Sequence, residues 1–499
     1  MYEVINVSLS QRSNHVSTHL YNNQESHIPY KRNAEVKYDN LIFLSALKNK
    51  NGTTNYSPRA IIYDLNGGLG SLGKYEYHEP KSNISISNDQ VIRNHIIEKN
   101  DYQINLDKGM SKPNLLNVEN TKYWTDYNKL IYRPKSLNEL QNWKLVPGKC
   151  FGVEKHISQI EFCEFRQGQS EYKNELENNI DLFRSYLEEC DLLQGVSLMT
   201  ETDSAWGGFT NELILSLKDE YFNNGSNSKY NIWTYGLLSF DFKLDSRGLC
   251  SRISSIVELS KNSSLFFPMN LDPSSSLLDK HFVPESLWHS SSIPSIFVDS
   301  IWGLNNKLQG PQRMSLIEDN LLRGDVNRNI INEIAIRSAS YENDVQMSPT
   351  KENVDINVAI DAYYSKKTLT TKPSADLSLT SADDAKYFVK NFVILQDEAL
   401  KARILSAVEL TPCNTYEHSK LNDITNTDTF PKTLSANNYY VEFNINSNLR
   451  KLMKSYHNIV SRSKYFDQLC DDKSELVEDI CMLVDEYTIG YDLSDDDFE

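Results

Sequence analysis

Residues 193–221 read LQGVSLMTETDSAWGGFTNELILSLKDEY. The segment opens with an apolar stretch at 196–199, which is typical of a buried strand, and continues through a polar, glycine-bearing stretch at 200–208. From Phe209 onward, large apolar side chains recur at every fourth residue, which predicts an amphipathic helix. A strand, a polar loop and a helix in this order predict a β-α unit, and α/β folds bind ligands at such loops.

Similar units lie on both sides of this segment. The strand-like stretches are 2–9, 59–65, 230–235 and 265–267, and the helical stretches are 171–190 and 252–260. Strands and helices that alternate at this spacing predict β-α-β crossovers. The expected fold class is therefore α/β, with a doubly wound, mostly parallel sheet that is flanked by helices.

The C-terminal part follows a different pattern. Helical periodicity is found at 385–405, 449–469 and 474–487. The Ser- and Pro-rich stretch at 271–300 is typical of a loop, and the polar stretch at 340–384 is typical of an insertion or linker. We expect a more divergent α+β region here.

Composition limits the classes of partner. The 499 residues carry a formal net charge of −17, so we expect no nucleic-acid partner, because an acidic surface repels phosphate backbones. The seven cysteines are dispersed, which predicts reduced thiols and no zinc site. No apolar run is long enough to form a transmembrane segment, and the N-terminal residues alternate like a strand rather than a signal peptide. These features predict a soluble cytosolic protein.

Two glycine-bearing stretches are candidates for phosphate binding. Residues 67–80 (GGLGSLGKYEYHEP) match most of the pattern G-x-x-x-x-G-K-[ST], but Tyr75 replaces the small hydroxyl residue and Pro80 disfavours the helix that should follow. We interpret this stretch as a glycine-rich turn. For the stretch at 200–208, two interpretations stay open. It is either a nucleotide-binding loop or a tight turn before a core helix, because Glu201 and Asp203 would repel phosphate in the absence of a metal.

No metal or catalytic constellation is evident. His15 and His19 stand four residues apart on a helix that Ser10 is predicted to cap, and such a pair could ligate a metal. No acidic third ligand is apparent nearby, so we expect no metal site. The pattern Gly-x-Ser-x-Gly of nucleophile elbows does not occur.

Several of these segments resemble the tubulin/FtsZ superfamily. Residues 56–65 (YSPRAIIYDL) are similar to the tubulin sequence Y-V-P-R-A-I-L-V-D-L, and residues 193–195 (LQG) match the residues before the tubulin signature. The first strand and the loop after it look like the tubulin segment with G-Q-C-G-N-Q, of which Gln11 and Asn14 are kept. The early segments and the sequence DSAWGG look like the Misato family, including its fungal mitochondrial-inheritance members.

The resemblance implies a nucleotide pocket that is only partly kept. Its residues would be Gln11, Asn14, Gly207, Gly208 and Thr210. The tubulin phosphate loop G-G-G-T-G-S-G aligns with residues 202–208, a degenerate GTP-binding loop in which only the final glycine is clearly retained. Ser251 and Ser254 stand in place of an acidic residue and an asparagine that contact ribose, and no N-x-D-x-x-E loop is found. We therefore expect no catalytic residue and no required cofactor, although GTP binding and residual GTPase activity stay open.

The resemblance also suggests a division of the chain. Residues 1–115 would form a Misato-type N-terminal tubulin-like segment, residues 120–310 a tubulin-like domain, and residues 311–499 a divergent C-terminal region. The last region would hold the polar insertion at 340–384 and an acidic tail at 488–499.

The implied function is that of a non-polymerising tubulin-like protein rather than an enzyme. It would act in mitochondrial distribution and partitioning and in the inheritance of mitochondrial DNA. The alternatives are a GTP-binding switch with an altered tubulin-type pocket and a chaperonin-linked factor in tubulin folding. The expected partners are tubulin, the cytoskeleton or the cytosolic chaperonin. The expected locations are the mitochondrion, peripherally on its cytosolic face, and the cytoplasm.

Overall fold

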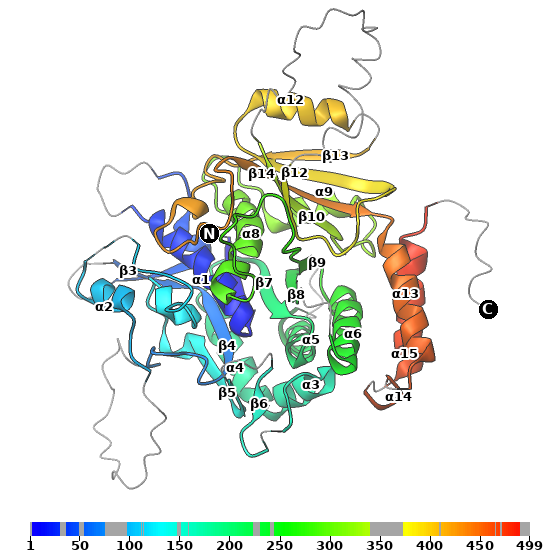
Figure 1. The fold of residues 1–499 in the computed structure, drawn as a ribbon, viewed down its shortest axis with the longest axis horizontal. Helices are drawn as coiled ribbons and strands as arrows, with labels where there is room; N and C mark the ends of the chain where they lie inside the picture. Colours follow the sequence, from blue (N-terminus) through cyan, green and yellow to red (C-terminus); the bar gives the residue numbers. More distant parts are fainter. Residues whose placement is uncertain are drawn as a thin grey trace, which may run out of the picture.

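The computed structural model of the chain describes most of the sequence, and the statements below concern those residues. They are 2–29, 36–48, 54–74, 97–110, 112, 114–146, 151–157, 159–222, 230–239, 244–339, 373–408, 411–464, 466–469 and 472–489. The described chain is built around two larger sheets, with a hairpin of C-terminal helices beside them (Figure 1).

The larger sheet has seven strands and confirms the predicted α/β fold. Its order is β6 (Val153–Glu154), β5 (Leu137–Lys144), β4 (Ala60–Asn66), β1 (Glu3–Leu9), β7 (Leu193–Glu201), β8 (Asn231–Leu238) and β9 (Leu265–Asn270). All neighbouring pairs are parallel except β5 and β6. The first strand of the chain therefore lies in the centre of the sheet, and its carboxyl end lies between those of β4 and β7.

Helices from two groups pack against the sheet and against each other. In one group, α1 (Gln11–Ser26) packs against α8 (Ser292–Asn305); in the other, α5 (Ala205–Leu217) packs against α3 (Phe165–Asn174) and α6 (Ser246–Asn262). Helix α4 (Leu176–Leu187) follows α3 after a break at Glu175, so the single helix predicted for 171–190 is two helices.

The loop predicted at 271–300 is wrong for its second half, which contains α7 (Leu287–Ser290) and the start of α8. Every residue of α8 is buried, and Trp302 stacks on Phe43 with ring centroids 4.0 Å apart. Two of the serines that made this stretch look like a loop, Ser295 and Ser300, bond within α8. For example, Ser295 Oγ donates to the carbonyl of Ser292 at 2.6 Å. Pro294 is tolerated because it lies in the first turn, where its missing N–H has no helical partner.

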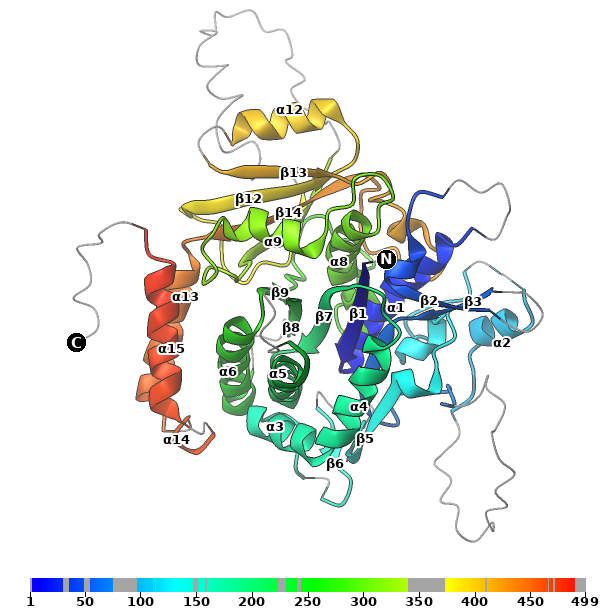
Figure 2. The same ribbon diagram turned by 180° about the vertical axis from the view of Figure 1, so that it is seen from behind.

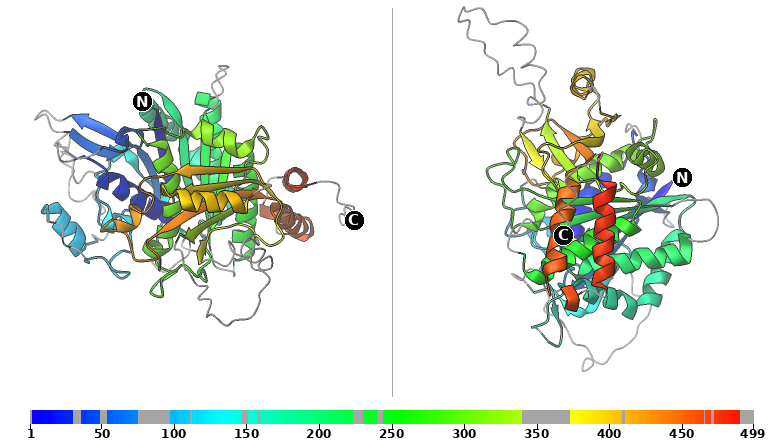
Figure 3. Two further views of the ribbon diagram at one scale, coloured as in Figure 1. Left: turned by 90° about the horizontal axis from the view of Figure 1, so that it is seen from above. Right: turned by 90° about the vertical axis from the view of Figure 1, so that its right-hand side faces the viewer.

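The C-terminal region forms a separate mixed sheet with helices, as expected for an α+β part. The strand order is β11 (Ser374–Asp376), β10 (Glu333–Ser338), β14 (Tyr439–Asn446), β12 (Tyr387–Ile394) and β13 (Cys413–Glu417). Only β12 and β13 run parallel. Seen from above, α12 (Glu398–Ala407) lies across this sheet (Figure 3, left). Its buried residues Leu400 and Ile404 form one apolar cluster with residues of the strands.

Two of the three C-terminal helical predictions are confirmed. Residues 449–469 contain α13 (Leu449–Arg462) and α14 (Phe466–Leu469), and residues 474–487 lie in α15 (Lys473–Glu486). Helices α13 and α15 pack together, and α15 also contacts α6 (Figure 2). The helix predicted from residue 385 is wrong, because residues 387–394 form β12 and the helix begins only at Glu398.

The remaining described elements are short, apart from the nine-residue α9. They are η1 (Asn40–Ile42), β2 (Leu44–Lys48), β3 (Thr54–Pro58), α2 (Asp101–Asp107), η3 (Trp124–Tyr127), η4 (Pro134–Ser136), η5 (Lys218–Phe222), α9 (Met314–Leu322) and η6 (Ile424–Asn426). Most of the predicted insertion (340–372) and most of the acidic tail (490–499) lie outside the described residues. No helix in the described part of the chain is long and apolar enough to cross a membrane.

Candidate functional site

The junction of β1 and α1 brings two predicted site residues onto one carboxylate. Ser10 adopts φ 109°, a region that favours glycine, and its side chain accepts a hydrogen bond from the backbone N–H of Ser13 at 3.2 Å. Gln11 Nε2 and Asn14 Nδ2 each donate to Asp64 Oδ2 at 2.9 Å. Because β1 and β4 are parallel neighbours, Asp64 reaches the start of α1 from the carboxyl end of its strand.

Asp64 is fully buried and surrounded by donors. Besides Gln11 and Asn14, Trp124 Nε1 donates to Oδ2 at 3.0 Å, and the backbone N–H of Leu65 donates to Oδ1 at 2.8 Å. Burial raises the pKa of Asp64 to about 7, while these four hydrogen bonds act in the opposite direction. The carboxylate therefore holds together residues from β1–α1, β4 and the distant η3.

The glycine-rich turn at 67–71 belongs to the same arrangement. Gln11 Nε2 also donates to the carbonyl of Gly68 at 2.7 Å. A Cβ at position 68 would overlap with the Asp64 carboxylate and with Gln11 Nε2, so only glycine fits here. The turn closes over Asp64, which accounts for this glycine without a bound phosphate. Residues 75–80 of the Walker-like stretch lie outside the described residues.

The other three predicted site residues lie in α5. The loop after β7 is shorter than expected, because Ser204 caps the helix and α5 begins at Ala205. Gly207 and Gly208 are therefore helical residues. A Cβ on Gly208 would overlap with the backbone carbonyl of Phe165 in α3, and one on Gly207 would overlap with Ser255 Oγ in α6. Both glycines face neighbouring helices at close approach.

Trp206 and Thr210 have their contacts within the protein. The Trp206 side chain is 3% exposed and packs edge-on against Phe162, with ring centroids 5.3 Å apart. Thr210 Oγ1 lies 2.8 Å from both the carbonyl of Trp206 and the hydroxyl of Thr200. Gln11 and Asn14 thus meet at Asp64, whereas the α5 residues form a separate packed group. The five-residue nucleotide pocket stays a prediction.

Two arginines near the β7–α5 loop are paired with its carboxylates. Arg252 of α6 makes a two-pronged contact with Asp203, with nitrogen–oxygen distances of 2.7 and 2.9 Å, and the backbone N–H of Ser239 also donates to Asp203. Arg12 Nε lies 3.9 Å from Glu201 Oε1, so the start of α1 is paired with the end of β7. The positive charges here are balanced by acids of the protein itself.

Trp124 and Arg252 were not predicted as site residues. Trp124 lies outside every strand or helix that the sequence predicted, and Arg252 is a lone cation in the predicted helix at 252–260. Apart from being a tryptophan and an arginine, neither residue had a sequence feature that marked it as part of a site. Each contacts its acidic partner across at least 49 residues of sequence, a separation that local patterns do not report.

The two histidines of α1 are core residues. His15 Nδ1 lies 2.9 Å from the hydroxyl of Tyr127, and His19 Nε2 lies 3.1 Å from the backbone carbonyl of Trp288. Both rings are buried, and burial lowers the pKa of each to about 3. Both are therefore neutral in the folded protein at neutral pH.

The close packing at Gly208 gives a first testable prediction. Gly208→Ala should lower the free energy of unfolding by about 1–3 kcal/mol, because the new methyl group forces α3 and α5 apart. Gly248→Ala in α6 is the matched control, since its methyl group would meet only side-chain atoms at 3.0 Å or more, those of Leu244 and Asp245 Oδ1, and no backbone. Chemical denaturation of both variants measures the difference. Equal stability of the two would contradict the packing role.

The buried histidines give a prediction about acid stability. An unfolded histidine takes up a proton below about pH 6.5, whereas His15 and His19 stay neutral down to about pH 3, so the folded state loses stability as the pH falls through this window. The loss should reach about 2 kcal/mol per histidine at pH 5. The double variant His15→Gln/His19→Gln should lose less stability than the wild type between pH 7 and pH 5 in parallel urea titrations.

Subtracting the two titrations also removes an opposing effect. Asp64 and Asp299 have pKa values raised to about 7 by burial, which favours the folded state at acid pH, but both carboxyls are present in both proteins. Identical pH profiles for the wild type and the double variant would show that the histidines do not set the acid stability.

Comparison with known proteins agrees with this architecture. Residues 2–108 match the family model described as Misato Segment II tubulin-like domain, and residues 113–308 match the model described as Tubulin domain.

The chain is 47% identical over 502 residues to Protein DML1 of Debaryomyces hansenii, with all of both chains covered. It is 40% identical over 529 residues to Protein DML1 of Scheffersomyces stipitis, which covers all of this chain and 99% of the relative. It is 33% identical over 577 residues to Protein DML1 of Candida albicans, again with all of both chains covered. The chain thus belongs to the Misato family of tubulin-like proteins.

Proposed function

We propose that this chain is a non-polymerising tubulin-like protein that acts in mitochondrial distribution, partitioning and mitochondrial DNA inheritance without hydrolysing a nucleotide. The observation that carries the nucleotide part of the proposal is the packing of Gly207 and Gly208 against α6 and α3. The organelle role rests on the resemblance to the fungal mitochondrial-inheritance members of the family.

The fold family implies a guanine nucleotide, and the residues at the corresponding place do not fit its phosphates. Phosphate binding at a helix N-terminus needs free backbone N–H groups, space for close approach and uncompensated positive charge. Here Ser204 caps α5, the glycines face other helices, and Arg252 is paired with Asp203. Glu201, at the end of β7, adds negative charge beside the loop.

The hydrolytic acid is also missing. In tubulins an N-x-D-x-x-E loop supplies the acid that activates water in the neighbouring subunit, and this sequence has no such loop. Residues 306–313, which connect α8 to α9, carry no acidic side chain. Glu318 in α9 is buried and accepts a hydrogen bond from Trp233 Nε1 at 3.2 Å, so it serves the packing of α9 on β8. These features support a protein that does not hydrolyse GTP.

One observation favours a second candidate function, a GTP-binding switch. Gln11 Oε1 and Asn14 Oδ1 are buried without a hydrogen-bond partner, and such orphan acceptors are costly. A donor on a base or ribose could satisfy them. The carboxylates around them disfavour a triphosphate, so we place this function second.

The proposed location is the cytosolic face of the mitochondrion, with peripheral attachment, together with the cytoplasm. The proposed partners are tubulin and other cytoskeletal proteins or the cytosolic chaperonin. If the chain acts on tubulin folding, its depletion should lower tubulin levels. If it is only a client of the chaperonin, the two should co-purify while tubulin levels stay unchanged.

A complementation experiment in cells tests the proposed function. Conditional depletion should produce unevenly distributed mitochondria and progressive loss of mitochondrial DNA. Both defects should be rescued by the wild type and by Arg12→Glu, because the Arg12–Glu201 pair is partly exposed and contributes little to stability. Fluorescence imaging of mitochondria and quantification of mitochondrial DNA give the readout.

The variant separates the two candidate functions. A second carboxylate beside Glu201 would repel a triphosphate, so failure of Arg12→Glu at normal protein level and thermal stability would favour the switch. Normal mitochondria after depletion would overturn the organelle role. Gly208→Trp, which cannot fit between α3 and α5, serves as the non-rescuing control.

A further inference from the structure

The second sheet ends in a strand with an open edge. Strand β13 pairs with β12 on one side, and among the described residues it has no neighbour on the other. Natural edge strands are usually guarded by proline, bulges or lysine, because their free backbone groups invite another strand. The five residues of β13, CNTYE, contain none of these guards.

The register shows which backbone groups are free. Lys390 N donates to the carbonyl of Pro412 at 2.9 Å, and His418 N donates to the carbonyl of Ile394 at 2.8 Å. In a parallel pair, alternate residues face the neighbouring strand, so the even-numbered residues of β13 bond to β12. The N–H and C=O groups of Cys413, Thr415 and Glu417 therefore point to the open edge. The carbonyl of Glu417 receives a long contact from Lys307 Nζ at 3.4 Å.

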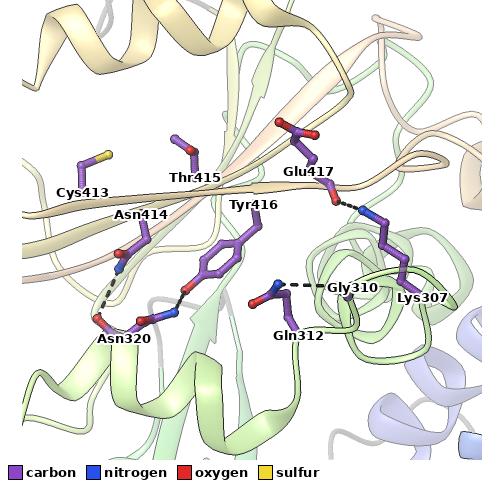
Figure 4. Close-up of a pocket in the computed structure, with 9 residues that line it drawn as sticks. All are labelled: Lys307, Gly310, Gln312, Asn320, Cys413, Asn414, Thr415, Tyr416 and Glu417. Atoms are coloured by element: carbon purple, nitrogen blue, oxygen red, sulfur yellow. Dashed lines mark hydrogen bonds between the residues drawn. The ribbon is translucent and has the colours of Figure 1, made fainter.

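An open cavity runs along the same strand. It has a volume of about 470 Å³ and is lined by all five residues of β13. The facing wall comes from the α8–α9 connection and α9, with Lys307, Gly310, Gln312 and Asn320 (Figure 4). Asn414 and Tyr416 point from the strand toward α9, where the Tyr416 hydroxyl lies 3.3 Å from Asn320 Nδ2. Side chains of an added strand would have room here.

The charge around this edge is positive in a strongly acidic chain. Lys401 Nζ lies 2.8 Å from Glu417 Oε1, and Lys401 and Lys307 together hold the pKa of Glu417 below its usual range. Arg323 lies close enough to act electrostatically on Cys413 and Tyr416. Around β13 the cations are thus Lys307, Lys390, Lys401 and Arg323, and the carboxylates are Glu398, Glu417 and Glu442. The remaining excess of one positive charge complements an acidic ligand.

We propose that the open edge of β13 and its cavity bind an extended, acidic segment of a protein partner. The segment would add to the sheet as a further strand, with backbone hydrogen bonds to Cys413, Thr415 and Glu417 and alternate side chains in the cavity. A carboxylate side chain near the Glu417 end would meet Lys307. This interaction is independent of the proposed organelle function and of any nucleotide.

The test uses a library of random twelve-residue peptides displayed on phage and selected against the immobilised full-length protein. Enriched peptides should be acidic and rich in β-branched residues. Thr415→Pro removes one outward N–H, so it should weaken the enriched peptides roughly tenfold in fluorescence anisotropy. Lys307→Glu should weaken the acidic peptides as well. Lys451→Glu makes the same charge change as Lys307→Glu on an exposed residue of α13, away from β13, and should bind as the wild type does.

Several results would overturn the proposal. Failure to enrich peptides, or equal binding to Thr415→Pro, would overturn the proposal. Hydrogen exchange provides a measurement that does not depend on the proline variant. The amides of Cys413, Thr415 and Glu417 should exchange freely in the isolated protein and become protected by peptide. Protection without peptide would overturn the proposal, because the edge would already be covered. So would a dimer that Thr415→Pro dissociates, which would make a second copy the occupant.

Discussion

A carboxyl group buried at the carboxyl end of β4 is the constraint on which the candidate site depends. Removing Asp64 from water is costly unless donors surround it, and the chain provides four of them from three separate segments. Because these donors must reach Asp64, the first turn of α1 and Trp124 of η3 lie beside it. The space that remains at position 68 accommodates only glycine. The predicted site residues Gln11 and Asn14 are thereby organised around a group of the protein itself.

A second constraint is the close approach of helices under the β7–α5 loop. Gly208 lets α5 approach the backbone of α3, and Gly207 lets it approach α6. Glycine in a phosphate loop makes room for a phosphate, whereas glycine at a helix crossing makes room for a neighbouring helix. The sequence alone does not distinguish the two. In this chain the helix starts early enough to put both glycines in the crossing. In the proposed function, this packing takes the place of phosphate binding at a tubulin signature position.

The sequence predicted the larger sheet because its strands alternate with amphipathic helices along the chain. The cap at Ser10 and the β-α unit at 193–217 followed from local patterns that need no distant partner. Helix α8 escaped prediction because the serines and prolines of 271–300 suggested a loop. Serines of α8 are tolerated in the buried helix because they bond back to preceding carbonyls. Strand β12 was mistaken for a helix because most of its residues are buried, so the alternation of a half-exposed strand is lost. Of the candidate site, Gln11 and Asn14 were identified by resemblance, whereas their acceptor Asp64 and the donor Trp124 required tertiary contacts that no local pattern reports.

The central claim is that the chain's own side chains and helix packing occupy the place of the nucleotide. Equilibrium dialysis of labelled GTP with magnesium against the purified full-length protein tests it most directly. The account predicts no saturable binding of GTP up to about 1 mM nucleotide. A dissociation constant of about 1 mM corresponds to a binding free energy of only about −4 kcal/mol. Saturable binding of one GTP per chain at micromolar concentration would contradict it.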